Sequence, residues 1–314
     1  MLEVRHSTTE NYELKENERF VYLRDANLHK GDGLACIVTI PSRFPNVAKL
    51  VLMIHGSLSH KNAIYQPLLA ERLADLGFFS IRLDFRGLGD SEDAPDPSVG
   101  RTIANDVDDI KLINDALQDT TVCQSLFGAS QLQLYAIVAH SRGSLAMFNF
   151  VLNLEIGTIP LLVNCSGRFD GNGLLDRCNR NHPGWQERGG TYATTLRYGR
   201  LQKVWMPKTE TLSVIQVNTE IYSKITKQSS IVSIYGTDDE IVPPIDASLA
   251  YATVFKGHHR LIYIDGAGHN FYGGKGDLNV NNLPYKRGLV NYNVELVRCL
   301  YNIFASTVEM DQNK

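Results

Sequence analysis

The amino-acid sequence predicts an α/β protein with a mostly parallel sheet flanked by helices. Apolar segments of strand length alternate with segments of helical spacing along most of the chain, and this alternation indicates parallel strands joined by crossover helices. Residues 49–56 form a continuous apolar run, which is typical of a strand covered on both faces. β-Favouring residues at 132–138 lead through a short corner into helical spacing at 145–151, which indicates a strand and a helix joined by a tight turn.

The first half of the chain supplies most of the predicted sheet. Polar residues dominate positions 1–15, which we expect to be loosely held. A turn-rich sequence at residues 30–33 separates the first two strands and suggests an antiparallel pair. The first helix ends at Gly77, which is a good C-cap. The predicted elements in order are strands at 20–24, 34–40, 49–56, 78–85 and 132–138 and helices at 62–77 and 102–119.

The second half continues the sheet but is interrupted. Residues 167–228 are rich in Gly, Arg, Asn and aromatic side chains, and they are too many for a bare loop in a compact domain. We therefore interpret this segment as a cap, and we predict one domain of eight strands with a core of residues 16–166 and 229–306. The remaining predicted elements are strands at 159–165, 230–236 and 261–265 and helices at 246–255 and 289–305.

Composition narrows the classes of protein and partner. The chain has 314 residues, 43% of them hydrophobic and 21% charged, which is ample material for a large core. A net charge of −3 gives no reason to expect nucleic acid as a partner. The N-terminus lacks a signal-peptide pattern and no apolar run is long enough to span a bilayer, so we expect a cytoplasmic protein. The five cysteines are widely spread without a C-x-x-C, so we expect reduced thiols and no metal site.

The stretch from Leu132 to Ser144 carries the first indication of chemistry. A strand that turns sharply into a helix needs small residues two positions on either side of the corner, and Ala139 and Gly143 satisfy this requirement around Ser141. Ser141 would then stand exposed at the N-terminus of a helix, whose dipole favours a developing negative charge. This arrangement predicts a nucleophile elbow.

A serine hydroxyl needs a base to accept its proton and an acid to orient the base. Two later loops supply both in the required order, each after a predicted parallel strand. The first runs from Gly236 to Pro243 and contains Asp238 and Asp239, and the second contains His269. Both loops follow the carboxyl ends of strands, which is the side on which ligands bind in open α/β sheets.

At this point the chain resembles the α/β-hydrolase superfamily of serine hydrolases from about residue 20 to residue 305. The resemblance implies an α/β-hydrolase fold with an inserted cap, and it places the acid of the triad at Asp239 and the base at His269. One departure is Ala139, where many members have Gly; Ala is small enough for little harm to be expected. The matching pieces are His55-Gly56-Ser57, the loop from Asp84 to Ser91, the elbow, the pattern from Gly236 to Pro243, and Gly266-Ala267-Gly268-His269.

The family pattern also implies an oxyanion hole and a substrate pocket. The backbone N–H groups of Ser57 and Arg142 are the expected oxyanion donors. Asp84 and Arg86 are expected to fix turns near the site rather than to act in catalysis. His55 and three cap aromatics are candidate substrate-binding residues, although the aromatics are equally explained as a small core within the cap, and His55 as a residue that orients its loop. Those three aromatics are Trp185, Tyr192 and Trp205.

The position of the cap resembles that of the cinnamoyl and feruloyl esterase-like hydrolases. The implied reaction is hydrolysis of a small to medium acyl or aromatic-acyl carboxylic ester through an acyl-enzyme, with no metal and no organic cofactor. A monoacylglycerol or lipid hydrolase, a thioesterase, a peptidase and an acyltransferase remain alternative enzymes. A catalytically idle hydrolase fold that binds a ligand or protein is the alternative of another class.

Overall fold

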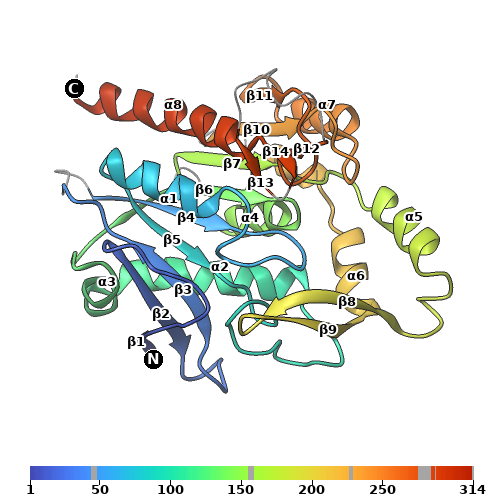
Figure 1. Ribbon diagram of the computed structural model, residues 1–314, viewed down its shortest axis with the longest axis horizontal. Helices are drawn as coiled ribbons and strands as arrows, with labels where there is room; N and C mark the ends of the chain where they lie inside the picture. The colour runs from blue at the N-terminus through green and yellow to red at the C-terminus, as the bar shows by residue number, and fades with distance from the viewer. Residues whose placement is uncertain (44–47, 155–158, 226–228, 275–283, 287, 313–314) are drawn as a thin grey trace.

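Nine strands form the central sheet in the residues that the computed structural model describes, which are 1–43, 48–154, 159–225, 229–274, 284–286 and 288–312 (Figure 1). The spatial order is β1-β2-β3-β5-β4-β6-β7-β10-β11. Strands β1, β2, β3 and β5 pair antiparallel in that order, and all pairings from β5 to β11 are parallel. The strands are β1 (Leu2–Ser7), β2 (Glu18–Asp25), β3 (Leu34–Thr39), β4 (Lys49–Ile54), β5 (Phe79–Leu83), β6 (Gln133–His140), β7 (Leu161–Cys165), β10 (Ser230–Gly236) and β11 (His259–Ile264).

This sheet confirms the predicted α/β-hydrolase fold and adds one strand to it. The eight predicted strands are all present, and the pair β2 and β3 is antiparallel as expected. The expectation of loosely held residues at the N-terminus was wrong for β1, which pairs with β2 from Leu2 to Ser7. Its side chains alternate between partly buried and exposed, so its apolar positions are too few for the sequence to distinguish this strand from a polar tail.

Helices cover both faces of the sheet because their apolar faces need partners. Helices α1 and α8 pack on one face, and α2, α3, α4 and α7 pack on the other. Helix α2 starts at Thr102, which forms a capping box with Asn105. No helix in the described part of the chain combines the length and apolar character needed to cross a membrane. The bounds are α1 (Gln66–Asp75), α2 (Ile103–Gln118), α3 (Thr120–Phe127), α4 (Arg142–Leu152), α7 (Pro244–Val254) and α8 (Asn293–Gln312).

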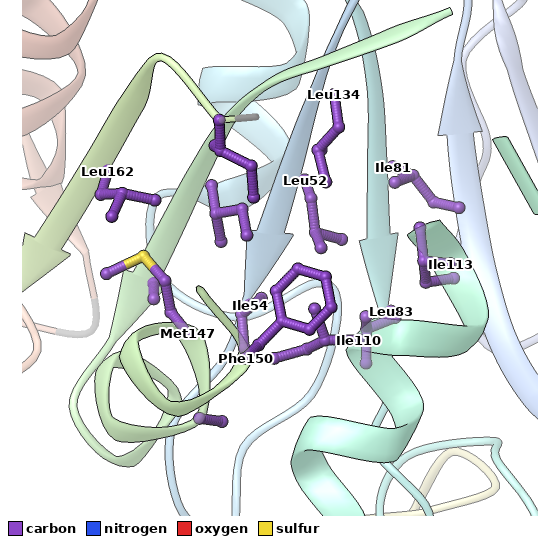
Figure 2. Close-up of a cluster of buried hydrophobic side chains, with 14 of the residues drawn as sticks. Leu52, Ile54, Ile81, Leu83, Ile110, Ile113, Leu134, Met147, Phe150 and Leu162 are labelled. Carbon is purple, nitrogen blue, oxygen red and sulfur yellow. The ribbon is translucent and has the colours of Figure 1, made fainter. Parts of the chain in front are cut away.

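The core beneath α2 and α4 holds the strand that leads to the elbow. Leu52 and Ile54 of β4 lie between side chains of β5, α2 and α4 (Figure 2). All of the labelled side chains in this cluster are buried. Burial of this kind contributes about 1.5–3 kcal/mol for each large aliphatic side chain. The β6 strand and the start of α4 are therefore held by dense packing and not by the loops around them.

The chain leaves the sheet between β7 and β10, where the sequence predicts the cap. This segment contains a helix, a two-stranded hairpin, a second helix and a 3-10 helix, which lie beyond the ends of the sheet strands (Figure 1). The hairpin strands pair with each other and with no other strand of the described residues. These elements are α5 (Asn172–Asn181), β8 (Gly190–Arg197), β9 (Arg200–Pro207), α6 (Lys208–Ile215) and η1 (Glu220–Lys224).

A small sheet precedes α8. Its order is β12-β14-β13, and both pairings are antiparallel. These short strands were not predicted from the sequence. Helix α3 was not predicted either; its N-cap is Asp119 and its C-cap is the left-handed Gly128. The strands are β12 (Tyr272–Gly273), β13 (Tyr285–Lys286) and β14 (Leu289–Asn291).

The loop from Asp84 to Ser91 is a buried polar network, in agreement with its predicted structural role. The Lys61 Nζ atom lies 2.5 Å from a carboxylate oxygen of Asp84 and 2.5 Å from one of Asp90. The backbone N–H of Asp90 also donates to Asp84 over 2.8 Å. Arg86 forms an ion pair with Asp109 of α2 over 2.5 Å. Each buried charge thus has an opposite charge in contact, which is the condition for keeping it out of water.

Candidate active site

Ser141 occupies the corner between β6 and α4. Its backbone has φ 51° and ψ −117°, a conformation that non-glycine residues rarely adopt. Gly143 makes the corner possible, because a Cβ atom there would lie 2.6 Å from the carbonyl oxygen of His55. Gly56 is equally constrained, since its Cβ would lie 3.1 Å from the Cβ of Ser141. The structure therefore has the elbow that the motif predicts, and the strain at Ser141 is held by its packed surroundings.

The predicted serine, histidine and aspartate meet at the carboxyl ends of their strands. The Ser141 Oγ atom lies 3.0 Å from Nε2 of His269. On the other side of the ring, Nδ1 of His269 donates to Asp239, with distances of 2.9 Å to Oδ2 and 3.1 Å to Oδ1. Because the carboxylate can only accept, Nδ1 carries the proton and Nε2 is free to accept from the serine hydroxyl.

Asp239 is fixed by its own loop. Its Oδ1 atom accepts the backbone N–H groups of Ile241, over 2.9 Å, and of Val242, over 2.8 Å. Its neighbour Asp238 is exposed, and its side chain contacts Thr237 and not the histidine. The structure therefore places Asp239, and not Asp238, beside His269.

The two expected oxyanion donors lie beside the serine. Ser57 and Arg142 both line the pocket that contains Ser141. Arg142 is the first residue of α4, where backbone N–H groups have no partner within the helix. Ser57 follows Gly56, whose close approach to Ser141 brings this loop against the corner. Both residues expected to supply oxyanion donors thus line the cavity beside Ser141.

His140, which directly precedes Ser141, is a further member of the site. It is buried, and its Nε2 atom donates to the backbone carbonyl of His269 over 3.0 Å. Burial, together with a smaller effect of the nearby His269, lowers the pKa of His140 to about 3. The imidazole is therefore neutral and holds the backbone of the histidine that contacts Ser141. The position of His140 next to Ser141 in the sequence does not reveal this contact, which depends on the tertiary structure.

The Arg142 side chain has a role that its backbone position did not suggest. It is buried and forms ion pairs with Asp106 of α2, over 2.9 Å, and with Glu210 of α6, over 3.2 Å. It also donates to the carbonyl of Arg101, which itself pairs with Asp106 over 3.0 Å. The residue that begins α4 thus connects the elbow to the cap.

A pocket of about 620 Å³ opens over the serine and is bounded by the core on one side and the cap on the other. This volume lies in the range that accommodates small organic ligands. The apolar part of its wall includes Leu145 of α4 and, from cap helices, Leu174 and Val214. Four residues of α5 line it at helical spacing, which presents one face of that helix to the cavity. These four are Leu174, Arg177, Cys178 and Asn181.

The four candidate substrate-binding residues lie outside this pocket wall, so that expectation was wrong. Trp185 is 1% exposed and donates to Asn179 over 2.9 Å, so it belongs to the core of the cap. Tyr192 and Trp205 are paired across β8 and β9 with ring centres 5.0 Å apart, and both are exposed to solvent. His55 is buried; its Nδ1 donates to the carbonyl of Gly56, and its Nε2 accepts the N–H of Phe85. Trp185 and His55 thus have structural roles, in the cap core and in loop orientation, whereas Tyr192 and Trp205 lie neither in the pocket wall nor in a buried cap core.

Several residues that line the pocket were not predicted from the sequence. Arg168 and Arg177 line the pocket, as do His60 and His182. The spacing of Leu174, Arg177 and Cys178 could have indicated a common helix face. Only the tertiary structure shows that this face is turned toward the serine.

The fold and this geometry define the class: the chain is an α/β-hydrolase. A family model described as serine aminopeptidase, S33, matches residues 45–176. A protein of Saccharomyces cerevisiae, uncharacterized protein YDL057W, is 42% identical over 310 residues, which cover 94% of each chain. The chain belongs to the same family as this yeast protein, within the α/β-hydrolase superfamily.

Solved structures share the fold at much lower identity. Est1E from Butyrivibrio proteoclasticus, solved with ferulic acid bound, has a TM-score of 0.61 at 16% identity and covers 90% of this chain and 96% of its own. A monoacylglycerol lipase of Paleococcus ferrophilus has a TM-score of 0.56 at 16% identity, covering 87% and 98%. Mouse alpha/beta hydrolase domain-containing protein 10 has a TM-score of 0.59 at 16% identity, covering 92% and 99%.

Proposed function

We propose that this chain is a serine hydrolase of carboxylic esters that acts through an acyl-enzyme. The observation that carries the proposal is the continuous chain of contacts from Ser141 through His269 to Asp239 at the base of a pocket. In this reaction Nε2 of His269 takes the proton of the Ser141 hydroxyl as Oγ attacks the ester carbonyl carbon. The same proton then passes to the leaving alcohol as the ester bond breaks.

The remaining groups have roles in the same sequence. Asp239 keeps the proton on Nδ1 of His269 and stabilises the imidazolium that forms. The N–H groups of Ser57 and Arg142 stabilise the oxyanion, and loss of one such donor typically costs ~10²–10³ in rate. Water, activated by His269, then attacks the acyl-enzyme and releases the acid. No step needs a cofactor.

The pocket supports a small to medium acyl or aromatic-acyl ester. Its volume of about 620 Å³ accommodates a ligand of that size beside the serine. Among the solved structures of similar fold, one holds ferulic acid and another is a monoacylglycerol lipase. Ferulic acid is a carboxylic acid and a monoacylglycerol is a carboxylic ester, and this chemistry supports the ester hydrolase over the other enzymes of the superfamily.

The test is hydrolysis of p-nitrophenyl esters from acetate to palmitate, and of methyl ferulate, by the wild type and by Ser141→Ala. We expect the substitution to remove nearly all turnover, by a factor of ~10³ or more, while the fold is kept. Ser144→Ala is a matched control, because Ser144 lies in the first turn of α4, donates to the carbonyl of Ala139 in β6 and does not line the pocket.

A fluorophosphonate probe tests the nucleophile independently of the substrate. It should label the wild type and Ser144→Ala, but not Ser141→Ala. A wild type that neither turns over any of these esters nor reacts with the probe would instead be a binding module with a hydrolase fold.

A further inference from the structure

The charged side chains on the pocket wall are not explained by the proposed chemistry. Three arginines and two glutamates line the cavity in the described residues, besides histidines. Arg142 forms ion pairs with both Glu210 and Asp106. Glu240 is exposed, and its carboxylate accepts the backbone N–H of His269 over 3.5 Å. The charged residues whose role is still to be explained are Arg168 and Arg177.

Neither of these two arginines has a carboxylate in contact within the described part of the chain. Arg168 is 9% exposed, and one of its nitrogens, Nη2, donates to the backbone carbonyl of Ile241 over 2.7 Å. Arg177 makes no hydrogen bond and no ion pair with any described residue, although its helix face is turned to the cavity. A guanidinium presents five N–H donors, so both side chains have donors to spare.

The two arginines also act on each other. Burial lowers the pKa of Arg168, and the positive charge of Arg177 lowers it further, against the opposing effects of Asp170 and Asp239. Like charges held close together are unfavourable unless an anion joins them. A carboxylate is well suited to this position, because it accepts two parallel N–H bonds from a guanidinium fork.

The rest of the wall restricts the shape of such a ligand. Apolar side chains of Leu145, Leu174 and Val214 lie on the same cavity as the arginines and the serine. A ligand that satisfies all three features has an ester at Ser141, an apolar middle and an anionic end.

We propose that Arg177, assisted by Arg168, binds a free carboxylate on the substrate, so that the enzyme acts on esters that carry a negative charge. The class comprises half-esters of dicarboxylic acids and acyl esters of hydroxy acids. This inference rests on the proposed ester hydrolysis and specifies its substrate class. Arg177 is a specificity-determining residue in this scheme and takes no part in bond making.

The test compares matched esters that differ only in the carboxylate. Monomethyl adipate and methyl hexanoate differ on the acyl side, and 5-acetoxypentanoate and pentyl acetate differ on the alcohol side. We expect kcat/KM for the anionic ester to exceed that for its neutral partner by ~10-fold or more in at least one pair. The pair that shows the preference identifies which side of the ester faces Arg177.

Substitutions assign the preference to the residue. Arg177→Gln should reduce the ratio of anionic to neutral kcat/KM to near one, mainly through KM for the anionic ester. Arg177→Lys should retain part of it, because the charge stays and the planar fork is lost. Arg180→Gln is the matched control: Arg180 lies in the same helix, is exposed and does not line the pocket, so the ratio should not change.

The possible failures are distinct. Wild type that hydrolyses neutral esters as well as anionic ones, or an Arg177→Gln variant that keeps the preference, overturns the carboxylate site and leaves the ester hydrolase standing. Wild type that hydrolyses no ester of either kind overturns the proposed function, and the carboxylate inference is lost with it.

Discussion

At the scale of single residues, the site depends on close approaches that only small side chains permit. Ser141 has a positive φ, and the chain around it passes within contact distance of the loop from His55 to Ser57. Gly143 and Gly56 stand at the two closest approaches. The backbone there cannot move away easily, because Ile54 and the start of α4 belong to the dense core under the elbow.

Gly143→Ala tests this constraint. The new Cβ atom would lie 2.6 Å from the carbonyl oxygen of His55 and 2.8 Å from Cγ2 of Ile54. We expect a loss of roughly 1–3 kcal/mol in the free energy of unfolding, together with a fall in probe labelling of Ser141. Urea denaturation measures the first effect. Gly274→Ala is the control, since no atom lies within 4 Å of its added Cβ; equal stability of the two variants would contradict the account.

Buried His140 predicts sensitivity to acid. Its pKa in the folded protein is about 3, below the usual value of 6.5, so below about pH 6.5 the unfolded chain gains a proton that the native protein does not bind. Stability should therefore fall as the pH decreases from about 6.5, by up to about 1.4 kcal/mol per pH unit for this group. His140→Gln should reduce the slope of unfolding free energy against pH between 4 and 6.

The exposed His258 provides the matched substitution for that experiment. His258→Gln should leave the slope as in the wild type. An unchanged slope in His140→Gln would mean that other groups govern the acid sensitivity.

The contrast between the triad and the pocket shows what sequence can predict. Ser141, Asp239 and His269 were predictable because each lies in a short motif directly after a strand, and parallel strands bring their carboxyl ends together. The exposed position of Trp205 was not predictable, because a hairpin residue faces the cavity or the solvent according to how the hairpin packs. The position of Arg177 in the pocket wall was not predictable either, because helical spacing defines a face of α5 but not what lies opposite that face.

At the scale of elements, α6 fastens the cap to the core through charge. Glu210 accepts from Arg142 of α4, over 3.2 Å, and from the backbone N–H of Arg101, over 3.1 Å. Two arginines and two acids thus meet where α2, α4 and α6 come together. Asp109, three residues after Asp106, is a second acid on the same side of α2. It forms an ion pair with Arg86 of the neighbouring loop.

Glu210→Gln should loosen this connection. The amide keeps the size of the side chain but leaves Arg101 and Arg142 with only Asp106 as a counter-charge. We expect the free energy of unfolding to fall by roughly 1–3 kcal/mol and kcat/KM to fall with it, because Glu210 and Arg142 both line the pocket. Differential scanning calorimetry and ester hydrolysis measure the two effects. Glu220→Gln, at an exposed position of η1, should change neither; a Glu210 variant as stable and active as this control would contradict the role.

At the scale of the whole molecule, the order of the sheet was predictable except at its first edge. The buried strands β4 to β7 can be predicted because each is a run of apolar residues, and the helices between them indicate that they pair in parallel. Strand β1 lacks such a run: Leu2 and Val4 alone pack against the core, and charged residues separate them. Because β1 lies at the sheet edge and is half exposed, its composition resembles that of a polar tail, and the sequence alone does not distinguish the two.

Removal of residues 1–7, which make up β1 and the methionine before it, tests how much this edge matters. Because β1 pairs only with β2, the shortened chain should keep the rest of the sheet and retain ester hydrolysis. It should also lose stability, since Leu2 and Val4 no longer cover the core. Thermal unfolding and activity against the same ester measure both. A shortened chain as stable as the full one would show that β1 contributes nothing.

The position of β1 has a consequence for how separate copies of the chain meet in solution. An uncovered strand offers a row of unpaired N–H and C=O groups to which another chain can add, and β2 beneath β1 is rich in buried apolar side chains. β1 pairs the free edge of β2 and becomes the edge itself, where charged side chains stand, with Glu3 bonded to Arg24 across the pair and Arg5 to Asp32. Charges on an edge strand disfavour the addition of another chain, so we expect the first seven residues to reduce aggregation as well as to cover the core.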